Sequence, residues 1–162
     1  MVFTDYITRD LIVQQEAKFN FEDLYDTLKS HLEKLKYTVT EKEYKDIIKE
    51  KTNFKIKWKT EKRMSDYIRF KIDIKLKGKN TTTIQTKQGQ MTQGTITIEF
   101  ESYIERDYED IYTKNPFLSF LRAVYDKFVI RNKMESYQTE LKDQTYEVFN
   151  LSKNFLKQQR FK

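Results

Sequence analysis

The chain has 162 residues with only 3 glycines and 1 proline, no cysteine and a formal net charge of +6. This length suits one domain with a sizeable core, and the scarcity of glycine and proline argues against a disordered chain. The lack of cysteine excludes disulfides, thiolate metal sites and cysteine nucleophiles. Since no apolar leader and no stretch of about 18 apolar residues is present, we expect a soluble, cytoplasmic protein without a transmembrane segment.

A strand followed by a helix is predicted at the start of the chain. Residues 3–19 alternate between apolar and polar side chains, as a half-buried strand does. Asn20 then precedes an apolar repeat at helical spacing that runs to about Lys36, with acidic residues in its first turn. Asn20 is therefore predicted to be the N-cap of an amphipathic helix.

The middle of the chain has the pattern of consecutive strands joined by short turns. The alternating segments are residues 37–48, 54–64, 67–77, 81–88 and 95–107, of which 81–88 is short and polar. Turns are predicted at Ser65–Asp66, at "KGKN" (77–80) and at "QGQ" (88–90). This order favours a curved antiparallel sheet of five to six strands with one solvated face.

A long helix is predicted over residues 116–158. Asn115 and Pro116 are a favoured cap residue and a favoured first helical residue. The apolar stripe that follows consists of Phe117, Phe120, Leu121, Val124, Tyr125 and Phe128. From Met134 the stripe thins and Thr145 falls at an apolar position, so the helix is either continuous or broken near Asn132. The chain, residues 1–162, is thus predicted to be one α+β domain of order β-α-β-β-β-(β)-β-α, with both helices on one face of the sheet.

Basic residues are concentrated in residues 54–79, which hold ten basic and three acidic side chains. The predicted strands there place seven cations on one face: Lys55, Lys57, Lys59, Arg69, Lys71, Lys75 and Lys77. Such a face could bind a polyanion such as a nucleic acid, but the aromatic rings that would stack on bases point the other way. If the strand at 95–107 lies beside it, Glu99, Glu101 and Glu105 would neutralise much of the charge. A solvated sheet face is the favoured interpretation.

No catalytic or metal-binding motif is found. The segment "GQMTQGT" (89–95) lacks the Lys-Ser/Thr of a phosphate loop and is interpreted as a hairpin. The carboxylates of "ERDYED" (105–110) do not match a calcium loop, and His31, the only histidine, has no evident orienting partner. We therefore expect no cofactor, no metal and no enzymatic activity.

The run "IEFESYIERDYEDIYTKNPFLSFLRAVYDKFVIR", together with "KIKWKTEKR" and "YIRFKIDIKLKG", resembles a group of small archaeal proteins of unknown function. This resemblance covers most of the chain and implies no activity. The order of elements is also similar to that of helix-grip domains, in which a curved antiparallel sheet wraps a long C-terminal helix. The likeness to helix-grip domains implies an apolar ligand held between sheet and helix, although this chain has one early helix where those domains usually have two.

Three functional hypotheses follow. The leading one is a soluble, non-enzymatic binding protein, with homo-oligomerisation through the C-terminal helix as one form of association. The first alternative is a carrier of an apolar ligand, with a pocket lined by Trp58, Phe70, Ile72, Phe100, Phe120 and Leu121. The second alternative is non-specific nucleic-acid binding through the seven cations of the sheet face.

Overall fold

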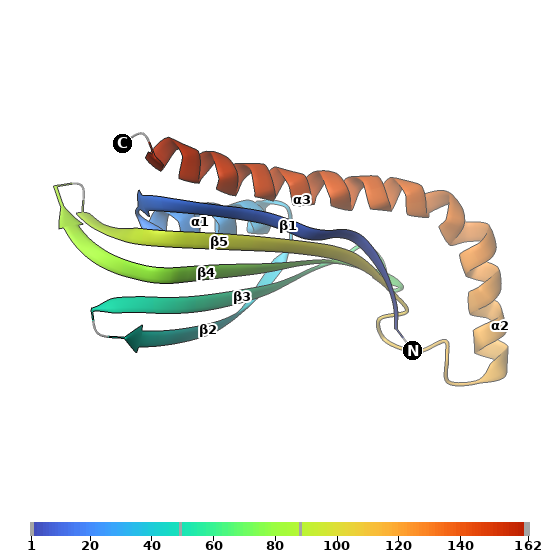
Figure 1. The fold of residues 1–162 in the computed structure, drawn as a ribbon. Coiled ribbons are helices and arrows are strands. Elements are labelled where there is room, and N and C mark those ends of the chain that lie inside the picture. The colour runs from blue at the N-terminus through green and yellow to red at the C-terminus, as the bar shows by residue number, and fades with distance from the viewer. Residues whose placement is uncertain (1, 49, 88, 161–162) are drawn as a thin grey trace.

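The computed structural model describes residues 2–48, 50–87 and 89–160. Its elements are β1 (Phe3–Phe19), α1 (Phe21–Lys34), β2 (Thr38–Ile48), β3 (Lys51–Arg63), β4 (Ile68–Thr86), β5 (Gly89–Arg106), α2 (Pro116–Tyr125), the π-helical turn η1 (Asp126–Ile130) and α3 (Arg131–Arg160). The strands form one antiparallel sheet in the order β1-β5-β4-β3-β2. Figure 1 shows α1 and α3 on the same side of this sheet. The predicted α+β fold with an antiparallel sheet is confirmed.

The first helix begins and packs as its sequence predicts. The side chain of Asn20 caps α1 by accepting a hydrogen bond from the backbone N–H of Asp23 at 3.2 Å. Leu24, Leu28 and Leu32 follow at helical spacing and are fully buried. This spacing places them on the face that meets the sheet.

The predicted turn at "KGKN" is wrong, because β4 runs through it to Thr86. The predicted short strand at 81–88 is therefore part of β4 as far as Thr86. The strand is irregular at this point: its pairing with β5 shifts between Lys79 and Thr82, and Asn80 adopts a φ of 53°. Gly78 serves close packing here, since a Cβ on it would lie 2.1 Å from the ring of Phe54.

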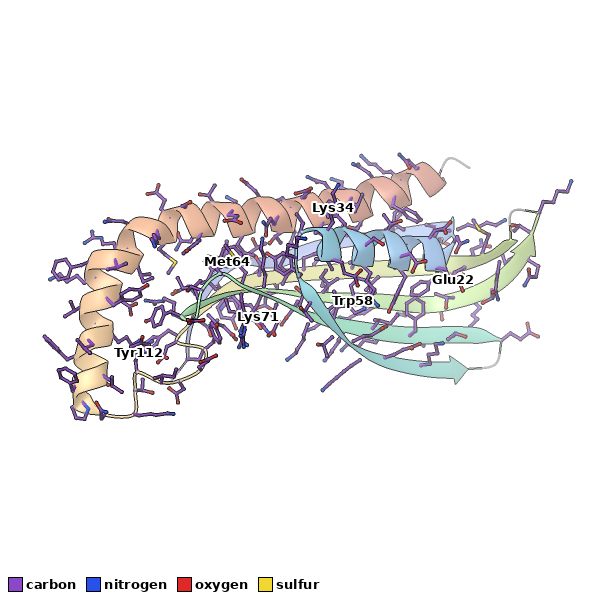
Figure 2. All side chains as sticks on the ribbon, turned by 180° about the vertical axis from the view of Figure 1, so that it is seen from behind. Glu22, Lys34, Trp58, Met64, Lys71 and Tyr112 are labelled. Atoms are coloured by element: carbon purple, nitrogen blue, oxygen red, sulfur yellow. The ribbon has the colours of Figure 1, made fainter. Side chains whose placement is uncertain are left out.

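The core lies between the sheet and the helices. Alternate side chains of β3, β4 and β5 point to this side and are buried, together with leucines of α1 and residues of α3. In Figure 2, Trp58 lies between α1 and the sheet, whereas Lys71 points to the opposite side. We call that opposite side the outer face of the sheet.

The C-terminal helix bends. Asn115 caps α2 as predicted, accepting from the N–H of Leu118 at 2.8 Å. α3 then runs along the sheet, while α2 turns across the end of the sheet (Figure 1). The π turn η1 lies between these two segments, and π turns are a known cause of bends in helices.

Candidate interaction surfaces

α2 faces the end of the sheet with a charged side chain. Arg122 is only 6% exposed. Its Nε donates a hydrogen bond to the hydroxyl oxygen of Tyr67 at 3.1 Å, and its guanidinium lies 3.5 Å from the carboxylate of Asp107 and 3.7 Å from that of Asp126. The guanidinium also lies 3.6 Å from the centre of the Phe3 ring. α2 is thus held by a buried cation and its partners, and we call Arg122, Tyr67, Asp107 and Asp126 the Arg122 cluster.

The partners of Arg122 are positioned by the ends of other elements. Asp107 directly follows β5 with a φ of 53°, and its carboxylate also accepts from the backbone N–H of Ile111 at 3.0 Å. The hydroxyl of Tyr67 donates to Asp126 at 2.7 Å, and burial raises the pKa of this phenol, so it stays a neutral donor. Tyr112, which Figure 2 shows between α2 and the sheet, packs edge-on against Tyr67 with ring centroids 5.7 Å apart.

The opposite side of α2 and η1 is apolar and faces outward. Phe117, Phe120 and Phe128 are 68%, 63% and 65% exposed. Smaller or partly covered apolar side chains adjoin them: Leu121, Val124, Tyr125 and Val129. We call these seven residues the α2 face. Tyr125 lies at the inner border, where its ring packs edge-on against Tyr67 with centroids 5.3 Å apart. The usual arrangement of an amphipathic helix is therefore reversed here, with the charged side packed inward and the apolar side exposed.

The six residues of the predicted ligand pocket lie in two places. Trp58, Phe70, Ile72 and Phe100 are at most 1% exposed and belong to the packed core. Phe120 and Leu121 belong to the exposed α2 face. Four of the six residues therefore fill the interior and two are exposed to solvent. The carrier hypothesis stays a prediction: a hollow of about 600 Å³ is lined by Phe21 of α1 and by Phe54 and Ile56 of β3, but none of the six predicted residues lines it.

One half of the outer face is neutralised by ion pairs. Arg69 binds the carboxylate of Glu105, directly opposite on β5, and that of Glu61 on β3 at 3.1 Å. Lys71 also lies 3.6 Å from Glu61. The predicted neutralisation thus occurs at these cations, with Glu61 adding to Glu105.

The other half of the outer face keeps unmatched lysines. Lys55 lies opposite Lys77, and Lys57 lies opposite Lys75 and beside Lys42 of β2. Lys77 pairs with Glu99 at 2.9 Å. The pKa of Lys55 is lowered, and the largest cause is repulsion from the charge of Lys57. We call Lys42, Lys55, Lys57, Lys59, Lys75 and Lys77 the lysine patch; with Lys77 excepted, no ion pair joins them to a described residue.

A depression of about 370 Å³ lies beside the lysine patch. Lysines line it from β3 and β4, and Glu99 and Glu101 line it from β5. Asp73 lies inside it, opposite Lys59. Its carboxylate accepts from the hydroxyl of Tyr103 at 3.2 Å, and burial raises the pKa of this carboxyl.

The remaining polar motifs have structural partners. In "ERDYED", Glu105 binds Arg69, Arg106 lies 2.9 Å from Asp5, and Asp107 belongs to the Arg122 cluster. Across the described residues, no group of three histidine or carboxylate side chains is placed to hold a metal ion. His31 lies 3.0 Å from Glu147, a contact that joins α1 to α3. Gly89 begins β5 opposite Thr86, as the predicted hairpin requires.

Comparison with known protein families, with curated proteins and with solved structures finds no match. None of the helices in the described ranges is long and apolar enough to cross a membrane.

Two features of these surfaces were missed by sequence reasoning. Lys42 joins the lysine patch only through the pairing of β2 with β3. The reversed orientation of α2 had a signal in the sequence. Ile130 follows Phe128 by two residues, which places them on nearly opposite sides of a helix with 3.6 residues per turn. Ile130 is buried and Phe128 is exposed, so the apolar residues before and after this point form two separate stripes.

Proposed function

We propose that the protein is a non-enzymatic interaction protein that pairs with a second copy of itself through the α2 face. The observation that carries this proposal is the orientation of α2. A charged cluster fastens the helix to the sheet, so its apolar side is held outward in a fixed position. A surface of this kind is typical of interaction sites.

The size of the α2 face supports pairing between two copies. At the exposed fractions of its seven side chains, it offers on the order of 600 Å² of apolar surface, the upper end for a monomer. Two copies would bury about 1,200 Å² together, which reaches the lower end of the range for specific interfaces. Exposed phenylalanines at the centre of the face would act as its anchors.

The charges beside the α2 face favour an antiparallel two-fold pair. The segment before α2 carries exposed acidic residues, Glu109 and Asp110, and one exposed lysine, Lys114, which leaves it net negative. The segment after η1 carries the exposed Arg131, Lys133 and Glu135, which leaves it net positive. In an antiparallel pair, the first segment of one copy lies beside the second segment of the other. The opposite charges would then meet at the rim and fix the orientation.

Sedimentation velocity over the micromolar range tests the proposal. We expect a dimer for the wild type, and we expect Phe120→Glu to raise the dimer Kd by about 100-fold, because a buried carboxylate would replace an anchor ring. Since Phe120 makes little contact within its own chain, the urea midpoint of this variant should match that of the wild type at protein concentrations below the dimer Kd. Ser136→Glu, an exposed position of α3, is the matched control and should leave the dimer intact.

A wild type that stays monomeric throughout this range would overturn the proposal. If that monomer bound vesicles containing anionic lipids, the α2 face would be assigned to a membrane surface instead.

A further inference from the structure

We infer that the lysine patch binds the phosphate backbone of a nucleic acid. The patch lies on the outer face of β2, β3 and β4, whereas the α2 face lies across the end of the sheet (Figure 1). The inference therefore goes beyond self-association and does not depend on it.

The first argument is the unfavourable placement of like charges. Lysines that lie directly opposite on neighbouring strands have Cβ atoms about 5 Å apart and repel each other. Two such pairs, Lys55 with Lys77 and Lys57 with Lys75, stand side by side, about 7 Å apart along each strand. The lowered pKa of Lys55 reflects this repulsion. A row of phosphates bound over these pairs would relieve it.

The second argument is the contrast within one face. Arg69 and Lys71 are matched by carboxylates on both neighbouring strands. Glu99, opposite Lys75 on β5, bonds to Lys77 at the border of the patch. The described outward carboxylates of β2 to β4 beside the patch are Asp73 and Glu61, and Glu61 is already paired with Arg69 and Lys71. The net positive charge is therefore confined to the side of β2, β3 and β4, and a polyanion would lie along these strands.

The side chains of the patch favour a nucleic acid over a lipid surface. Binding to a lipid surface combines cations with inserted apolar side chains. The described outward side chains of β2 to β4 beside the lysines of the patch, such as Thr40, Glu61 and Asp73, are not apolar. One exposed apolar side chain, Ile12 of β1, lies across the depression, opposite Glu99. The exposed ring nearest to this face is Tyr6, which pairs with Tyr103 on β1 and β5, beyond the patch. Without rings for stacking among its described side chains, the patch would contact phosphates and would not read bases.

Fluorescence anisotropy with labelled oligonucleotides of about 20 nucleotides tests the inference. We expect binding that is independent of base sequence and that weakens steeply between about 50 and 200 mM salt. Lys57→Ala/Lys75→Ala should lower the affinity at low salt about tenfold and reduce the salt slope by about 1.4 for single strands, because two phosphate contacts are lost. Lys142→Ala/Lys157→Ala removes two exposed charges from α3 and is the matched control, which should change both values little.

A gain of affinity provides the opposite test. Asp73→Asn removes the carboxylate beside Lys59 while its amide oxygen can still accept from Tyr103. We expect this variant to bind several-fold more tightly than the wild type. Absence of binding at about 50 mM salt would overturn the inference. Equal weakening by the two lysine double variants, or binding to anionic vesicles without binding to oligonucleotides, would overturn it too.

Discussion

The role of Arg122 depends on which side of α2 faces the sheet. On a solvent-exposed side it would be one more surface cation, but in the structure it lies between Tyr67, Asp107 and Asp126. Asp107 is only 2% exposed, so its carboxylate depends on the guanidinium and on backbone N–H groups for compensation. The cluster therefore determines which side of α2 remains exposed.

Replacing Arg122 should destabilise the protein strongly. We expect Arg122→Met to lower the free energy of unfolding by about 3 kcal/mol, because it leaves the buried Asp107 carboxylate without its cation. The double variant Arg122→Met/Asp107→Asn should recover a large part of this loss, since the unpaired charge is then gone. Urea denaturation of the wild type, the two single variants and the double variant measures the coupling. Additive effects of the two changes would contradict a direct interaction between these residues.

At the scale of elements, the glycine within β4 led to the prediction of a turn that the structure does not contain. The stretch "KGKN" has the composition of a turn, yet β4 continues through it. Local composition cannot reveal the reason, which is that the ring of Phe54 from β3 occupies the space beside Gly78. By contrast, the turn at Ser65–Asp66 was predictable because its own hydroxyl completes it: Ser65 accepts from the backbone N–H groups of Tyr67 and Ile68.

A methyl group at Gly78 tests this explanation. A Cβ there would lie 2.1 Å from the Phe54 ring, so Gly78→Ala should lower the free energy of unfolding by about 1–3 kcal/mol. In a Phe54→Ala background the same change should cost much less, because the obstructing ring is absent. The measurement is a double-mutant cycle by urea denaturation. An equal cost in both backgrounds would show that contact with Phe54 is not the reason for the glycine.

The C-terminal helix was predictable in extent but not in orientation. Its beginning at Asn115–Pro116 follows from local chemistry. Thr145, at an apolar position, is buried without penalty because its hydroxyl donates to the carbonyl of Leu141 at 2.7 Å. The spacing of Phe128 and Ile130 signals two separate apolar stripes, but which of them faces outward depends on the long-range contacts of Arg122 with Tyr67 and Asp107.

At the scale of the whole molecule, the order of the strands determines the charge of the outer face. Alternation alone predicted that the lysines of β3 and β4 share one face. Whether Glu99 and Glu105 neutralise them depends on β5 lying between β1 and β4, a long-range arrangement. This arrangement places Glu105 opposite Arg69 and Glu99 opposite Lys75, where Glu99 bonds to Lys77, but it brings no carboxylate opposite Lys57, which lies between Lys42 and Lys75. The position of the lysine patch therefore required the structure.

The folded state as a whole should weaken at alkaline pH. A hydrogen bond to Glu41 raises the pKa of Tyr25 to about 12 from its usual 10.0, and burial raises the pKa values of Tyr37, Tyr67 and Tyr103 as well. Because these phenols are harder to ionise when folded, their stabilising effect is complete below pH 10.0 and is lost as pH rises through the folded pKa.

Urea midpoints between pH 9 and 12 measure this effect. We expect the wild type to lose stability progressively above about pH 10. Tyr25→Phe should lose less between about pH 10 and 12, because position 25 then has no phenol to ionise. The same alkaline slope in the wild type and in Tyr25→Phe would contradict the role assigned to the Tyr25–Glu41 hydrogen bond.

The central claim is that the α2 face holds a second copy of the chain, and disulfide trapping tests it most directly. The chain has no cysteine, so a single introduced thiol can report on one position. Leu121 lies near the middle of the α2 face, where an antiparallel two-fold pair brings identical residues together. We predict that mild oxidation links Leu121→Cys into a covalent dimer while Ser136→Cys, on the exposed polar side of α3, stays monomeric. Equal trapping of both variants, or no trapping of Leu121→Cys, would contradict the claim.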